Sequence, residues 1–247
     1  MPRRPRQKSE SGIYHIMLRG INQQAIFEDD EDYDKLLETL KKYKAVSEYK
    51  IYAYCLMSNH FHLLLKVEKE NLEQIIKRIA GSYVYWYNIK YRRSGHLFQD
   101  RFKSEAVETD RYLLAILRYI HQNPLKAGLC QNITGHKYSS YQDFLKDDSA
   151  LIDIDYVYSI IRKEEFEKFN SETSNDVFLD NEEKHYINDS DALKIIESVS
   201  GCRNISEFQL LDKSQRNIYI AELKTNGLSI RQISRLTGVS FGIVRRL

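Results

Sequence analysis

Cysteine is scarce in this sequence of 247 residues, and long hydrophobic runs are absent. Cys55, Cys130 and Cys202 are isolated thiols without the paired spacing of a metal site, so neither a disulfide scaffold nor a zinc knuckle is indicated. No stretch approaches the roughly 18 apolar residues that a membrane helix requires, and the basic first residues are not followed by the apolar core of a signal peptide. We therefore expect a cytoplasmic protein with no membrane partner.

An excess of charge of one sign is also missing. The 37 basic and 35 acidic residues give a formal net charge of +2, so bulk charge alone does not indicate a nucleic-acid partner. The distribution is more informative, because residues 1–8 and 231–247 carry basic side chains and no acidic ones. We expect the C-terminal arginines to contact DNA, with ordinary solvated surface as the alternative; they are Arg231, Arg235, Arg245 and Arg246.

Hydrophobic periodicity predicts the order strand, helix, strand, strand, helix, strand in the first half of the chain. The predicted strands are 13–18, 50–57, 60–67 and 102–109, and the predicted helices are 31–46 and 72–90. A third helix is predicted to start at Asp110 as its cap and to end at Pro124, because proline disfavours helical geometry in the residue before it. This order predicts an α+β fold: a ferredoxin-like antiparallel sheet with helices on one face and the other face open to a ligand.

The chain is predicted to contain a main domain, a connector and a small helical unit. We place the main α+β domain at 1–150 and an acidic helical connector at 151–211, where the hydrophobic pattern weakens. Residues 212–247 then show short helical segments separated by glycine turns, and the last of these segments is rich in arginine. This pattern predicts an all-α, helix-turn-helix-like unit that binds DNA.

Two histidines stand out on the predicted strand 60–67. Side chains alternate between the faces of a strand, so His60 and His62 lie on the same face, with Phe61 on the other. Two neutral imidazoles a few ångströms apart supply half of a divalent-metal site. A bare pair of this kind is also compatible with ordinary surface or core histidines.

The predicted third helix offers a nucleophile to such a site. Tyr119 and Asn123 are four residues apart and share a helix face, so a phenol and an amide oxygen can approach the same metal. A phenolate that attacks a phosphodiester forms a covalent phosphotyrosine, which keeps the bond energy for rejoining. Without the histidines, a core tyrosine would be the simpler interpretation.

Four segments resemble the REP-associated tyrosine transposases, which are single-tyrosine members of the His-hydrophobe-His (HUH) nuclease superfamily. Residues 57–65 read MSNHFHLLL, and residues 118–128 read RYIHQNPLKAG. Residues 95–103 read GHLFQDRFK, and the segment 12–20 contains GIYHI followed by Arg19 and Gly20. Together these segments cover about residues 12–130, and their order and spacing are much more specific than any one of them.

The resemblance implies metal-dependent cleavage and rejoining of single-stranded DNA, often at hairpin-forming repeats. It implies that His60 and His62 bind the metal, Mg²⁺ or Mn²⁺, that Tyr119 is the nucleophile, and that Asn123 is the third ligand with Gln122 as a rival. Single-stranded or hairpin DNA is the implied partner. A monomer and a homodimer both fit, because Tyr119 can complete the site of its own chain or of a second copy.

Further basic residues near the predicted site are expected to hold DNA. Arg19 lies in the first family segment, while Arg101 and Lys103 alternate on one face of the predicted fourth strand. A solvated strand edge is the alternative for the latter two. At the level of function, two alternatives to a transposase stay open: a non-mobilising regulator that binds structured DNA, and a metal-dependent hydrolase that nicks DNA without forming an adduct.

Overall fold

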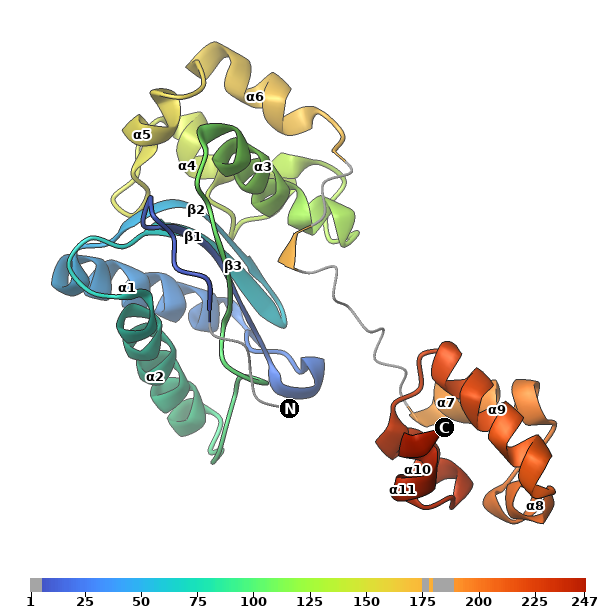
Figure 1. Ribbon diagram of the computed structural model, residues 1–247. Helices are drawn as coiled ribbons and strands as arrows, with labels where there is room; N and C mark the ends of the chain where they lie inside the picture. The colour runs from blue at the N-terminus through green and yellow to red at the C-terminus, as the bar shows by residue number, and fades with distance from the viewer. Residues whose placement is uncertain (1–5, 175–177, 180–188) are drawn as a thin grey trace. The chain divides into compact units, whose positions relative to one another are not determined.

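The computed structural model describes residues 6–174, 178–179 and 189–247. Contacts divide the chain into one unit of residues 1–179 and a second of residues 180–247 (Figure 1). This division falls between the boundaries expected at residues 150 and 211. None of the helices in the described segments is both long and apolar enough to cross a membrane.

The first unit is built on a four-stranded sheet. Its strands are β1 (Ile13–Arg19), β2 (Lys50–Met57), β3 (His60–Lys66) and β4 (Lys103–Ala106). They lie in the order β2-β3-β1-β4, and every neighbouring pair is antiparallel. This confirms the ferredoxin-like arrangement, in which the first strand lies between the third and the fourth. The fourth strand is shorter than the predicted 102–109.

Two long helices cover one face of this sheet (Figure 1). They are α1 (Asp30–Ser47) and α2 (Leu72–Lys90), close to the predicted ranges. Asp29 caps α1 by accepting from the backbone N–H of Asp32, and the Asp32 side chain reaches back, so the two form a capping box. Leu36 and Leu40, four residues apart on α1, are fully buried against the sheet.

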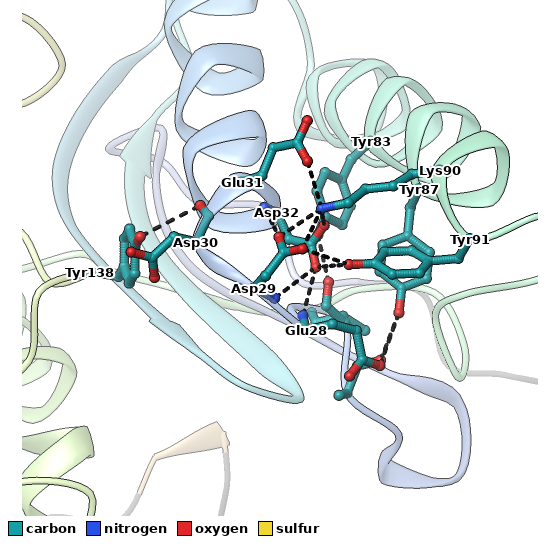
Figure 2. A network of polar contacts seen from close by, with 12 residues as sticks. Glu28, Asp29, Asp30, Glu31, Asp32, Tyr83, Tyr87, Lys90, Tyr91 and Tyr138 are labelled. Carbon is teal, nitrogen blue, oxygen red and sulfur yellow. Dashed lines mark hydrogen bonds and ion pairs between the residues drawn. The ribbon is translucent and has the colours of Figure 1, made fainter.

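A buried ion pair ties the start of α1 to the end of α2 (Figure 2). The Asp32 carboxylate is fully buried and lies 2.9 Å from Nζ of Lys90. It also accepts hydrogen bonds from the Tyr91 hydroxyl at 2.8 Å and from the backbone N–H of Glu28 at 2.6 Å. Burial alone would lower the pKa of Lys90, but its hydrogen bonds to Asp29 and Asp32 outweigh burial and raise that pKa. Nζ of Lys90 also lies 2.6 Å from Asp29 and 2.9 Å from Glu31, so three carboxylates share one ammonium in this link between the two helices.

The third long helix, α3 (Asp110–Lys126), crosses the opposite face of the sheet, over β2 and β3. Its cap is Thr109, not Asp110 as predicted, because the Thr109 hydroxyl accepts from the backbone N–H of Tyr112. The prediction that Pro124 ends the helix was also wrong. Proline removes only its own hydrogen bond, and the Ala127 N–H still donates to the Asn123 carbonyl, so the last turn is kept.

Three shorter helices follow α3 in the first unit, and the last two of them lie in the part of the chain expected to be a connector. They are α4 (Tyr141–Lys146), α5 (Ile154–Tyr158) and α6 (Lys163–Ser171), and short 3₁₀ turns occur at Ile21–Gln23 and Ile133–Gly135. His121 of α3 is fully buried between the amide oxygen of Asn170 at 3.0 Å and the hydroxyl of Ser140 at 2.9 Å. Burial lowers the pKa of His121 to about 4, although the Asn170 hydrogen bond partly opposes this shift.

The second unit is a small helical bundle with its own core. Its helices are α7 (Asp189–Ser200), α8 (Ile205–Leu210), α9 (Lys213–Thr225), α10 (Ile230–Thr237) and α11 (Phe241–Arg246). Phe208, Ile220, Ile233 and Val244 are buried in it. Gly238 joins α10 to α11 at φ 71°, a left-handed conformation that glycine adopts without strain. The short helices and glycine turn expected within 212–247 are therefore present.

Candidate active site

The strand register brings several polar side chains onto the face of the sheet that α3 covers. His62 on β3 lies opposite Met17 of β1 and Cys55 of β2. Because side chains alternate, His60 and His62 share this face, and His15, two residues before Met17, shares it as well. The sheet thus gathers three imidazoles where the sequence pattern predicted two.

Each of the two predicted ligands, His60 and His62, makes a polar contact through its Nδ1 atom. Nδ1 of His60 lies 2.6 Å from the amide oxygen of Asn59. An amide oxygen only accepts, so this His60 nitrogen carries the proton and Nε2 is the basic nitrogen. Nδ1 of His62 lies 3.0 Å from Nε2 of His15, and both of these rings are fully buried. An imidazole binds a metal through an unprotonated nitrogen, such as Nε2 of His60.

A carboxylate lies behind His15. Nδ1 of His15 is 3.9 Å from Oε1 of Glu105 on β4, and the Tyr112 hydroxyl of α3 donates to the same oxygen at 2.5 Å. Burial alone would raise the pKa of Glu105, but the interactions with His15 and Tyr112 outweigh burial and lower that pKa. Glu105 is therefore a carboxylate held on the histidine face of the sheet.

Tyr119 of α3 lies directly over this face. Its ring meets those of His62 and His15 edge-on, with centroids 5.7 Å and 6.0 Å away, and the side chain is only 8% exposed. Nζ of Lys126 lies 5.3 Å from the centroid of the Tyr119 ring, two turns further along α3. The predicted nucleophile and the predicted imidazole ligands are thus brought together by α3 packing on the sheet.

The two amides that compete for the place of a third ligand have different surroundings. The Gln122 amide nitrogen donates to the carbonyls of Asn170 at 2.6 Å and Glu172 at 2.9 Å, so this side chain is engaged with the end of α6. Asn123 is buried one turn after Tyr119 on α3. This difference favours Asn123 over Gln122.

The donor set fits a metal site with open positions. Within residues 6–174, 178–179 and 189–247, no three His, Cys, Asp or Glu side chains form a cluster that could hold a metal ion. A site built on His60 and His62 would therefore need an amide oxygen or the DNA itself to complete it. Imidazole nitrogens with oxygen ligands suit divalent transition ions, and an incomplete protein shell leaves room for substrate.

Two of the basic residues predicted to bind DNA lie on the same face as the histidines, and one does not. Arg19 pairs in register with His60, and Lys103 pairs with Met17. The prediction that Arg101 alternates with Lys103 on the fourth strand was wrong, because β4 begins at Lys103 and Arg101 occupies a bend before it. The Asp100 carboxylate accepts from the backbone N–H of Arg101 at 2.7 Å, which holds the bend.

The C-terminal arginines belong to the second unit. Arg231, Arg245 and Arg246 are exposed there. Arg235 donates to the Asp189 carboxylate at 2.6 Å, so part of its charge is compensated within the unit. These residues carry no ligand or nucleophile chemistry, and the expectation that they bind DNA stays a prediction.

Sequence reasoning missed three residues of the site. His15 had been noted only as part of a family segment, although its strand parity relative to Met17 would have placed it on the histidine face once the sheet order was known. Glu105 was missed for the same reason. Phe178 lies in the segment expected to be an acidic connector, yet its ring centroid is 4.7 Å from that of Tyr119. Nothing in the local sequence pattern indicates that contact.

A groove runs beside α3, and Tyr112, which donates to Glu105, is one of the residues that line it. Its volume is about 720 Å³, and Arg111, Tyr112, Arg118 and Phe169 are among the residues that line it. The Arg118 guanidinium lies 4.5 Å from the centroid of the Phe169 ring. Guanidinium groups and aromatic rings suit the phosphates and bases of a DNA strand.

Comparison with known families agrees with the motifs. The model of the family described as "Transposase IS200 like" matches residues 8–123, a range that includes His60, His62, Tyr119 and Asn123. The resemblance to the tyrosine transposases is thereby confirmed. Among curated proteins, no sequence matches the chain.

One solved structure supports the fold. A REP-associated tyrosine transposase bound to a REP hairpin is similar with a TM-score of 0.53 and 16% identity, over 59% of this chain and 86% of that one. A protein from Deinococcus radiodurans R1 that is assigned as a transposase gives a TM-score of 0.35 and 17% identity, over 49% of this chain and 97% of the other. The first likeness confirms the α+β architecture.

Proposed function

Because residues 8–123 match the IS200-like transposases, we propose that this protein cleaves and rejoins single-stranded DNA through a covalent bond to Tyr119. The observation that carries the proposal is the contact between Tyr119 and His62, whose rings meet edge-on at 5.7 Å. This contact supports a mechanism in which a nucleophile and a metal ligand act on the same phosphate. Transfer through a covalent intermediate explains why a phenol is placed there.

The metal would be held by His60 and His62 through their Nε2 atoms, with Asn123 as the third protein ligand. A bound divalent ion, Mg²⁺ or Mn²⁺, supplies Lewis acidity that polarises a phosphate and offsets its developing negative charge. The remaining tasks belong to the chain itself. Asn59 orients the imidazole of His60 by accepting a hydrogen bond from its Nδ1 atom.

The reaction has two steps that mirror each other. In cleavage, the phenol oxygen of Tyr119 bonds to phosphorus while one P–O bond of the DNA backbone breaks, and the phenol proton ends on the DNA hydroxyl that leaves. In rejoining, a DNA hydroxyl attacks the phosphotyrosine and restores the phenol. No bond energy is lost between the steps, so neither needs a nucleotide cofactor.

Basic side chains on the same face would hold the DNA backbone. Arg19 and Lys103 extend from β1 and β4 beside the histidines, and Arg111 and Arg118 line the groove along α3. Charges of this kind bind phosphates without reading sequence. We infer that the single strand follows this groove towards Tyr119.

Hairpin DNA is the substrate form that we propose. The similar solved transposase was bound to a REP hairpin, and its likeness covers 86% of that protein. We infer that the second unit adds affinity for duplex DNA, since α10 and α11 meet at a glycine turn and carry exposed arginines, as in a helix-turn-helix. The stem of a hairpin would offer it a double-stranded target.

The test is to incubate the full chain with an end-labelled, single-stranded hairpin oligonucleotide and Mn²⁺, then separate the products on a denaturing gel. A labelled band that migrates with the protein supports the transposase. Cut DNA without such a band would instead indicate a hydrolase that only nicks. Binding without any cleavage would indicate a regulator that recognises structured DNA. Tyr119→Phe is the matched negative control.

A further inference from the structure

Three strands and one helix meet in a chain of polar contacts behind the histidines. His62 of β3 contacts His15 of β1 at 3.0 Å, His15 faces Glu105 of β4 at 3.9 Å, and Glu105 accepts from Tyr112 of α3 at 2.5 Å. His15 and His62 are both fully buried. We propose that His15 and Glu105 are positioning residues, which hold His62 in the tautomer and ring orientation that metal binding requires.

The argument starts from the contact between the two imidazoles. At 3.0 Å, one of the two facing nitrogens must carry the proton and the other must accept it. If Nδ1 of His62 is the donor, Nε2 of His62 is the basic nitrogen, as in His60. If instead Nε2 of His15 is the donor, the basic nitrogen of His62 points at His15 and away from the metal position.

Glu105 decides between these two arrangements. A neutral imidazole has one proton, and the carboxylate attracts that proton to Nδ1 of His15, the nitrogen that faces it. The distance of 3.9 Å is longer than a direct hydrogen bond, so the attraction acts through charge, which is strong in a buried environment. With its proton on Nδ1, His15 presents Nε2 as an acceptor to His62.

Tyr112 fixes the carboxylate in turn. Its hydroxyl donates to Oε1 of Glu105, the same oxygen that faces His15. Glu105 is also paired in register with His15 across β1 and β4, so its backbone position is set by the sheet. Ligating histidines commonly donate their second nitrogen to a carboxylate or carbonyl group, and loss of such a partner typically costs about 10-fold to 100-fold in metal affinity. Here a second histidine stands between ligand and carboxylate.

The experiment measures Mn²⁺ binding to the full chain by isothermal titration calorimetry, without DNA. His15→Phe keeps a ring of similar size but removes the acceptor, and we expect Mn²⁺ affinity to fall about 10-fold to 100-fold. His15→Gln restores an acceptor and should recover most of that affinity. Glu105→Gln removes the charge and should weaken binding by a smaller factor. Glu68→Gln, which neutralises a carboxylate paired with Lys66 at the other end of β3, is the matched control.

Equal Mn²⁺ affinity in the wild type, His15→Phe and Glu105→Gln would overturn the proposal. Thermal unfolding with chelator present shows whether each variant is folded. If His15→Phe is not folded, the Mn²⁺ affinity of Glu105→Gln decides: weaker binding than in the wild type supports the proposal, and equal binding overturns it. Electron spin echo measurements on bound Mn²⁺ count the coordinated imidazoles. Two coordinated imidazoles support a positioning role for His15. A third coordinated imidazole that disappears in His15→Gln would make His15 a ligand and overturn the proposal.

The inference rests on the proposed function, but the two can be overturned by different results. If the wild type binds Mn²⁺ and forms the covalent adduct while the His15 variants bind equally well, the transposase stands and the positioning role does not. If His15→Phe loses Mn²⁺ affinity but no variant and no wild type forms an adduct, the metal site and its support stand without strand transfer. A wild type that binds no Mn²⁺ overturns both.

Discussion

The ring of Tyr119 stands almost perpendicular to the ring of His62, with an interplanar angle of 89° and centroids 5.7 Å apart. This contact joins α3 to β3, two elements that are separated in the sequence by a helix and a strand. Neither residue would indicate chemistry if it were buried alone. Their meeting on one face of the sheet is the physical basis of the proposed transfer through a phenol.

Tyr119→Phe should abolish the covalent adduct. The variant keeps the ring that packs on His62 and His15, so folding and DNA affinity should be retained, while the oxygen that attacks phosphorus is lost. We expect adduct formation to fall by more than about 1000-fold, measured with labelled hairpin DNA on a denaturing gel.

The choice of control tyrosine follows from the structure. Tyr112, two turns earlier on α3, is not an inert control, because its hydroxyl donates a hydrogen bond to Glu105. Tyr85 on α2 is 72% exposed and makes a cleaner control, and Tyr85→Phe should leave the adduct unchanged. An adduct that survives in Tyr119→Phe and disappears in Tyr112→Phe would show that the nucleophile is misassigned.

His60→Ala and His62→Ala should each prevent cleavage while DNA binding persists. Each removes one imidazole from the proposed metal site, whereas affinity for DNA rests on contacts between basic side chains and phosphates. Chelator should have the same effect on the wild type, and added Mn²⁺ or Mg²⁺ should restore cleavage only there. Cleavage by the double variant in the presence of chelator would rule out the metal site.

Much of this site follows from local patterns, and the remainder depends on how distant segments meet. Alternation along β3 predicts that His60 and His62 share a face, and helical spacing predicts that Tyr119 and Asn123 do. The place of His15 beside His62 could not be predicted in this way, because it depends on the register in which β1 pairs with β3. Register is a long-range property that the pattern of one strand does not contain.

The same reasoning explains the errors in the second half of the domain. The segment expected to begin a connector at residue 151 has weak periodicity, yet α5 and α6 pack on the first unit. α6 is held there by the buried ring of Phe166, which stacks on Phe144 at 4.6 Å, and by the hydrogen bond of Asn170 with His121, and the partners of both lie in other segments of the chain. The weak hydrophobic pattern and the acidic composition therefore gave the wrong interpretation of this part of the connector.

Removal of the second unit should weaken DNA binding without abolishing chemistry. A chain that ends after residue 179 keeps α6, whose Asn170 supports His121 and whose end engages Gln122, whereas a chain that ends at 150 would lose both contacts. We expect hairpin affinity to fall and its salt dependence to become shallower, because fewer phosphates are neutralised. Fluorescence anisotropy at several salt concentrations measures both. Unchanged affinity would assign the second unit a role other than DNA binding.

Lys90→Met should destabilise the first unit without changing the reaction. It leaves the buried Asp32 carboxylate without its cation, although the Tyr91 hydroxyl and the Glu28 N–H still donate to it (Figure 2). We expect a loss of about 1–3 kcal/mol in the free energy of unfolding, measured by urea denaturation. Lys69→Met, which removes an exposed pair with Glu48, should have little effect. Similar losses in both variants would contradict a special role for the buried pair.

Stability should fall as the pH is lowered from about 6.5 towards 4, and His121 should account for part of that fall. Its pKa is about 4 in the folded chain, against an ordinary value of 6.5, because burial disfavours the charged ring. Its hydrogen-bond partners, Asn170 and Ser140, are uncharged and offer no counter-charge. Between these two pH values the unfolded chain binds a proton that the folded chain does not.

The sign of the effect follows from this difference in bound protons. The contribution of His121 to stability is greatest above pH 6.5 and decreases as the pH falls from 6.5 towards 4. Below about pH 4 this contribution no longer changes. A shift of this size corresponds to roughly 3 kcal/mol. Carboxylates such as Glu70 and Glu108, whose pKa values are lowered by hydrogen bonds, also reduce stability in acid, so the wild type alone is not sufficient.

The comparison with His121→Gln isolates the histidine. Glutamine can still hydrogen-bond to Asn170 and Ser140 but does not titrate, so the carboxylates contribute equally to both chains. We expect the variant to be less stable at pH 7.5, and the difference between the two chains to shrink as the pH approaches 4.5. Urea denaturation at several pH values measures it. A difference that stays constant over this range would mean that His121 is charged in the folded chain or is not buried in solution.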